Sequence, residues 1–185
     1  MTTQTSVILI VAIIAIGVAA LILLRQRSRK LRSKFGPEYQ RAVYERGSTF
    51  KAERELEERA KRVERFRLRH LNNAEAERFA QEWRTTQEKF VDDPRGAVAD
   101  ADLLVQETMK ARGYPTGGEF DAQTADLSVD HPFVISNYRA AHEIAVRNER
   151  TPASTEDLRL AMKHYRALFE DLLDRKVEEI TGARR

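Results

Sequence analysis

Cysteine is absent from the 185-residue sequence, and glycine, proline and tryptophan are scarce, with eight, five and one residues. Without cysteine the chain has no disulfide framework and no cysteine nucleophile. Glycine and proline are too few, and show no repeating period, for a collagen-like or low-complexity chain. Most of the chain is therefore expected to fold.

Motifs for catalysis and nucleotide binding are also missing. The G-x-S-x-G pattern of serine hydrolases does not occur, and Ser128 and Ser136 stand at no recognisable spacing from a base. The segment Gly113–Gly118 lacks the Lys-Ser/Thr ending of a P-loop. Neither HExxH nor the Glu-x-x-His pair of di-metal bundles is present. The sequence names no reaction and implies no cofactor.

Positive charge is concentrated in one short block. The formal net charge of the chain is +3, and six positive residues precede the first acid, Glu38. They are Arg25, Arg27, Arg29, Lys30, Arg32 and Lys34. Residues 35–185 therefore carry a net charge of about −3. Because no basic excess covers the part expected to fold, we do not expect a nucleic-acid-binding domain.

One run, Val7–Leu24, contains no polar side chain. At about 1.5 Å per residue, a helix of this run covers about 27 Å, close to the hydrocarbon thickness of a bilayer. A helix at the surface of a soluble protein has a polar face, and this run has none. A cleavable signal peptide is the alternative, but residues 1–6 hold no Lys or Arg, and the run ends at Arg25 without a small-residue cleavage site. We therefore predict a retained transmembrane helix.

The basic block follows the apolar run, and no Lys or Arg precedes the run. By the positive-inside rule, the N-terminus is expected outside and the C-terminal domain in the cytoplasm. The same six side chains can also hold anionic lipid headgroups, at about 1 kcal/mol each near the surface. A topology signal alone is the simpler interpretation, and both remain open.

Apolar residues recur at helical spacing through the rest of the chain, and no strand pattern is sustained. The predicted fold class is all-α. The organisation is a short tail (1–6), a transmembrane helix (7–24), a basic juxtamembrane segment (25–34), a charged helical stalk (35–71) and a helical bundle (72–185).

Two helices are expected in the stalk. Gly36-Pro37 and Gly47-Ser48 bound a short one that ends at about Arg46. A charge-rich helix then runs from Thr49 to about Arg69, with a narrow apolar stripe that suits packing by one edge. The stripe consists of Ala52, Leu56, Val63 and Phe66.

In the bundle, Asn72 and Glu75 resemble a capping box before a helix whose apolar stripe runs from Phe79 to Val91. Asp93-Pro94 begins a second helix, which ends at Gly113 and forms an antiparallel hairpin with the first. The other expected elements are a short helix near Ala122–Val129, a helix from Pro132 to Thr151, and a last helix from Ser154 whose stripe reaches Ile180.

Aspartate and histidine residues provide the candidates for a metal or catalytic site. Asp126 and Asp130 share a face if their segment is helical, and helical bundles bind metals through carboxylates and histidines. In the structural alternative, Asp130 and His131 cap the next helix and His142 lies at the edge of the core. The full candidate set is Asp126, Asp130, His131, His142 and His164.

Three further groups have a structural and a functional interpretation. Tyr114 and Pro115 either belong to a plain helix connection or contact a partner protein. Phe79, Trp83 and Phe90 either fill the core or line a ligand pocket. Four arginines form an anion site if the last two long helices pair, and solvated surface otherwise. They are Arg139, Arg150, Arg159 and Arg166.

Four segments carry a resemblance to a known family. They are FAQEWRTTQEKFVDDP (79–94), ADLLVQETMKARGYP (101–115), ADLSVDHPFVISNYRAAH (125–142) and STEDLRLAMKHYRALFEDLL (154–173). Together they resemble a family of bacterial single-span proteins, typical of high-GC genomes, that join an N-terminal helix to a small helical domain. The family has no assigned activity, so the resemblance implies a bacterial membrane protein of unknown function.

Two functions are consistent with these features. The first is a non-enzymatic helical module, anchored in the bacterial inner membrane by residues 7–24, that binds a partner protein or itself on the cytoplasmic side. The second is a metal-dependent or small-ligand-binding helical enzyme, which requires the Asp and His candidates to converge. A lipid or nucleic-acid binder that uses the basic block ranks below the first.

Overall fold

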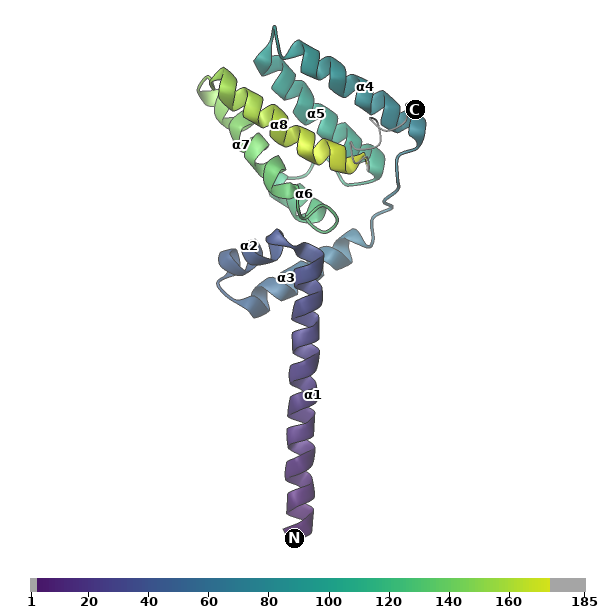
Figure 1. The fold of residues 1–185 in the computed structure, drawn as a ribbon, viewed down its shortest axis with the longest axis vertical. Coiled ribbons are helices and arrows are strands. Elements are labelled where there is room, and N and C mark those ends of the chain that lie inside the picture. The colour runs from purple at the N-terminus through teal and green to yellow at the C-terminus, as the bar shows by residue number, and fades with distance from the viewer. Residues whose placement is uncertain (1–2, 174–185) are drawn as a thin grey trace, which may run out of the picture. The chain divides into compact units, whose positions relative to one another are not determined.

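The computed structural model describes residues 3–173, and every regular element along them is an α-helix (Figure 1). The all-α prediction is therefore confirmed. The chain divides into two compact units, Met1–Glu57 and Glu58–Arg185. The first unit contains the apolar N-terminal helix, and the second contains the bundle.

Helix α1 runs from Thr3 to Phe35 and includes the whole apolar run. From Val11 onward it is long and apolar enough to cross a membrane, and none of its apolar window is buried. Ile13, Ile16 and Leu23 are each more than 60% exposed. In water, each of these exposed aliphatic side chains would lack the stabilisation of about 1.5–3 kcal/mol that burial of such a side chain provides.

The C-terminal end of α1 joins two shorter helices in a small core. Helix α2 runs from Pro37 to Arg46 and helix α3 from Thr49 to Val63, as the glycine breaks predict. Phe35, Tyr39 and Leu56 are fully buried. The Tyr39 hydroxyl donates a hydrogen bond of 2.7 Å to the Glu53 carboxylate, so the buried carboxylate has a polar partner.

Helix α3 ends at Val63, so the prediction that it continues to about Arg69 is wrong. Residues 67–72 are non-helical, and the Arg69 amide donates to the Arg112 carbonyl at the end of another helix. Phe66, Leu68 and Leu71 pack against the core of the bundle. Phe66, the last residue of the predicted stripe, thus packs against the bundle together with Leu68 and Leu71 of the non-helical segment 67–72, which we call the strap.

Helices α4 (Asn73–Lys89) and α5 (Pro94–Arg112) form the expected antiparallel hairpin. Asn72 and Glu75 form a complete capping box, in which each side chain accepts a hydrogen bond from the backbone N–H of the other residue. The stripe predicted to reach Val91 stops earlier, because α4 ends at Lys89 and Val91 is 83% exposed.

Three more helices complete the described part of the bundle. They are α6 (Phe120–Leu127), α7 (Ile135–Arg150) and α8 (Thr155–Leu172). Ser154 caps α8 as predicted. The predicted start of α7 at Pro132 is wrong, because residues 132–134 form turns and no side chain caps the helix. Ile180 lies outside the described residues.

The core lies between α4, α5, α7 and α8. Helix α5 contacts α4, α7 and α8, and α8 lies between α5 and α7 (Figure 1). Trp83 of α4 stacks on Phe169 of α8, with ring centroids 4.8 Å apart. Phe79 and Trp83 are buried, which favours the core interpretation of these aromatics. The buried stripe of α5 consists of Val98, Ala101, Leu104, Val105, Thr108 and Met109, as predicted.

The end of α5 depends on glycine. Gly113 has φ +95°, and a Cβ built there would lie 2.4 Å from the Arg67 carbonyl oxygen. Gly117 has φ +97°, and a Cβ there would meet nothing within 4 Å. The two glycines therefore share a left-handed backbone, but only Gly113 is also held against the strap.

We expect Gly113→Ala to destabilise the bundle at least twice as much as Gly117→Ala. The second substitution introduces only the left-handed strain of about 1–2 kcal/mol, whereas the first also forces Arg67 away. Urea unfolding of the full chain in detergent, followed through the fluorescence of the single tryptophan, Trp83, measures both. Equal shifts of the unfolding midpoint would contradict the close approach of the strap.

Candidate functional site

Asp126 and Asp130 lie near each other in the chain but have different partners. Asp126 is 8% exposed and forms an ion pair with Arg62, whose Nε donates to Oδ1 over 2.6 Å. The Asp130 carboxylate accepts a hydrogen bond of 2.9 Å from the Tyr114 hydroxyl. Asp126 fixes α6 to the end of α3, and Asp130 fixes the turn after α6 to the loop after α5. Each carboxylate therefore has a structural contact.

His131 is 5% exposed, and its Nδ1 lies 2.6 Å from the Asp171 carboxylate near the end of α8. Its Nε2 is buried without a hydrogen-bond partner. The interpretation that Asp130 and His131 cap α7 is wrong, because both side chains bond to other elements. Sequence analysis identified His131 but not Asp171, since forty residues separate the pair.

The other two candidate histidines contact side chains on α6 and α7. The His142 ring stacks on Phe120, with centroids 3.7 Å apart and planes 10° from parallel. His164 Nδ1 lies 3.0 Å from the Asn137 side-chain oxygen. Burial lowers the pKa of His164, and the neighbouring Lys163 lowers it further. His164 is therefore held in its neutral form at and above neutral pH.

The five Asp and His candidates thus make separate contacts. Within residues 3–173, no three His, Asp or Glu side chains lie close enough together to hold a metal ion. The convergence that the enzyme hypothesis requires is not found there.

A buried polar cluster that the sequence analysis missed lies between α5, α7 and α8. Tyr138 and Tyr165 meet edge to face, with ring centroids 6.0 Å apart. Burial raises the pKa of both phenols, and the carboxylate of Asp102 raises it further. Asp102 falls four residues after Val98 and three before Val105, a spacing that places it beside the buried stripe. The phenols are neutral across the physiological range.

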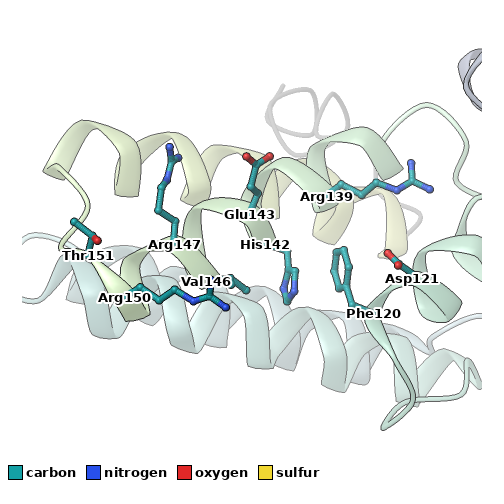
Figure 2. A pocket seen from close by; sticks show the side chains of 9 residues that line it. All are labelled: Phe120, Asp121, Arg139, His142, Glu143, Val146, Arg147, Arg150 and Thr151. Atoms are coloured by element: carbon teal, nitrogen blue, oxygen red, sulfur yellow. The ribbon is translucent and has the colours of Figure 1, made fainter. Parts of the chain in front are cut away.

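An open groove of about 570 Å³ follows the outer face of α7 (Figure 2). The stacked rings of His142 and Phe120 lie along it, and the aliphatic side chain of Val146 lies between His142 and Arg150. The rim carries both signs of charge, because Asp121 and Glu143 accompany its three arginines. The arginines are Arg139, Arg147 and Arg150.

A second groove, of about 360 Å³, lies between α4 and α8. Its apolar lining comes from Trp83, Phe90 and Met162. Its polar lining contains one amide and three cations, and no acid: Gln87, Arg159, Lys163 and Arg166. The Trp83 indole N–H is buried and has no hydrogen-bond partner. The surface combines an apolar base with a cationic edge.

The four arginines that form an anion site in one of the two interpretations of the sequence are divided between these grooves. Arg139 and Arg150 line the groove of α7, and Arg159 and Arg166 line the groove between α4 and α8. Arg159 and Arg166 also bond to Glu156 and Glu170 of their own helix. Lys163 is the cation of the second groove without an acidic partner on α8.

The loop after α5 presents different residues from those expected. Tyr114 is 4% exposed, and its hydroxyl is bonded to Asp130, so its ring belongs to the core. Pro115 is exposed. Partner contact at this loop stays a prediction for Pro115 and its exposed neighbours.

In the juxtamembrane segment, the six basic residues have unequal surroundings. Arg27 forms a two-point ion pair with Glu57 of α3, at 2.5 and 2.7 Å. The Arg32 guanidinium lies 5.0 Å from the centre of the Tyr39 ring. Arg25, Arg29, Lys30 and Lys34 are exposed. A hollow of about 370 Å³ on α1 is lined by Leu21, Leu24, Arg25, Ser28, Arg29 and Arg32.

Comparisons of the chain with protein-family models, with curated proteins and with solved structures gave no match. The functional argument therefore depends on the residues and surfaces described above.

We expect His164 to titrate below the ordinary histidine value of about 6.5. Lys163→Gln should raise its pKa only part of the way back, because burial is the larger cause. Since the folded-state pKa is depressed, the stability from neutral His164 is present above about pH 6.5 and is lost as the pH falls below it. NMR titration, with His164→Gln for assignment, measures the pKa. An ordinary or raised value would contradict the burial.

Proposed function

We propose that the protein is a single-pass protein of the bacterial inner membrane whose cytoplasmic helical bundle binds other proteins, as a scaffold and not as an enzyme. One observation carries the membrane part of the proposal: the apolar side chains of α1 are exposed around the helix, and nothing within residues 3–173 covers them. A helix of this kind is stable when lipid surrounds it, since its backbone hydrogen bonds are all internal.

The orientation follows from charge. All the Lys and Arg residues that flank the apolar run lie on its C-terminal side. Such an excess is retained on the cytoplasmic side during insertion. The bundle, which carries no apolar run of comparable length, is therefore expected on the cytoplasmic side.

The groove between α4 and α8 is the surface best suited to a protein partner. The half-buried Phe90 supplies an aromatic contact of the kind enriched at interfaces, and the buried Trp83 and Met162 form the apolar base of the groove. The cationic edge, with no acid in the lining, favours an acidic partner surface. The groove of α7 is less selective, because Asp121 and Glu143 lie among its arginines.

We expect the double substitution Ile14→Arg and Ile16→Arg to release the full chain from membranes. Each arginine near the centre of the span costs about 2.5–3.5 kcal/mol, and each Ile, Leu or Val of the run gains about 0.3–0.6 kcal/mol. Two charges therefore offset most of the gain from the run. Extraction of membranes with alkaline carbonate measures the release.

The matched control is Ile14→Leu with Ile16→Leu, which keeps the run apolar and should leave the protein in the membrane pellet. If the unaltered chain is itself extracted by carbonate, α1 does not span the bilayer and the proposed anchor is wrong.

We also expect a photo-crosslinking residue at Gln87, on the edge of the groove, to form a discrete adduct in cells. The same residue at Glu107, which is exposed on α5 and lines neither groove, should form none. Lys163→Glu should reduce the adduct at least about fivefold, because a rim charge that meets an acidic partner is worth about 1 kcal/mol. Lys163→Arg should preserve it.

The mass of the adduct distinguishes a second copy of the chain from another protein. Equal crosslinking at Gln87 and Glu107 would contradict docking at this groove. An adduct yield that Lys163→Glu leaves unchanged would contradict it as well.

A further inference from the structure

The basic residues of α1 are not spread evenly around the helix. At about 100° per residue, Arg25, Arg29 and Arg32 fall within about 60° of one another. Lys30 and Lys34 lie on another side of the helix, more than about 90° away. The basic block at the end of the apolar run therefore has one face with three arginines and an opposite face with Arg27 and the two lysines.

Contacts within the chain divide the arginines further. Arg27 is turned to Glu57, and its charge is neutralised there. Arg32 remains exposed, but its guanidinium is positioned by the Tyr39 ring. Within residues 3–173, Arg25 and Arg29 form no ion pair with the chain. The arginine face therefore keeps its positive charge available.

The hollow on this face has an apolar end and a polar end. Leu21 and Leu24 precede the charged residues and belong to the apolar run. Arg25, Ser28 and Arg29 follow within the next turn and a half, and no acid is part of the lining. If α1 spans the bilayer, this is the depth at which acyl chains give way to headgroups.

We propose that Arg25, Ser28, Arg29 and Arg32 bind the phosphate of an anionic phospholipid, whose acyl chain contacts Leu21 and Leu24. Guanidinium groups donate two parallel hydrogen bonds to phosphate oxygens, and the Ser28 hydroxyl can donate a further one. Three positive charges without an acid favour an anionic lipid over a zwitterionic one, whose own cation would be repelled. The site rests on the proposed transmembrane position of α1.

The experiment compares two adjacent positions. Arg29→Gln and Lys30→Gln each remove one charge, at depths that differ by about 1.5 Å, but on different faces of α1. The full chain in a mild detergent is mixed with equimolar phosphatidylglycerol and phosphatidylcholine, and the retained lipids are counted by native mass spectrometry.

We expect the unaltered chain to retain phosphatidylglycerol preferentially. Arg29→Gln should weaken this retention about fivefold, the factor that corresponds to one Lys or Arg near a lipid surface. Lys30→Gln should change it less than about twofold. Arg29→Lys keeps the charge but not the two-point geometry, so it should retain more phosphatidylglycerol than Arg29→Gln and less than the unaltered chain. It also tests whether the position tolerates substitution.

Equal losses in Arg29→Gln and Lys30→Gln would overturn the proposal in favour of a diffuse basic collar. No preference for phosphatidylglycerol in the unaltered chain would also overturn it. Excess inorganic phosphate at constant ionic strength should leave the lipid bound, and displacement would assign the site to free phosphate instead. Carbonate extraction tests the span separately, so a failed lipid site in a retained protein is distinguishable from a failed anchor.

Discussion

The apolar surface of α1 is the constraint on which the rest of the molecule depends. In the described part of the chain, no folded element covers the Ile, Leu and Val side chains of its exposed window. Aliphatic side chains around the whole circumference of a helix leave no face for water, and burial in hydrocarbon is the arrangement that removes this cost.

The segment after the apolar run combines two roles that sequence alone does not separate. Arg27 holds α3 against α1 through Glu57, and Tyr39 is held by Glu53 within the same small core. These contacts direct one side of α1 toward protein and leave Arg25 and Arg29 on another side. A collar of six positive residues thus consists of a structural part and an exposed part, and only the exposed part can meet lipid.

Local signals predicted most of the fold, because capping and periodicity act over a few residues. The capping box at Asn72, the cap at Ser154 and the buried stripe of α5 are examples. Contacts between residues that are far apart in the sequence were not predicted. No local pattern indicates the strap at Arg69 or the pair formed by His131 and Asp171, because both depend on tertiary packing. The grooves likewise arise from helix pairing, although four of their five arginines were candidates from the sequence; Arg147 was not.

Placement of the two ends of α1 on opposite sides of the membrane tests the central claim most directly. Because the chain contains no cysteine, single substitutions Thr3→Cys and Ala122→Cys give unambiguous labelling sites. In intact bacterial spheroplasts, an impermeant maleimide should label Thr3→Cys, and it should label Ala122→Cys only after the membrane is opened. Labelling of Ala122→Cys in intact spheroplasts would contradict a single span with a cytoplasmic bundle.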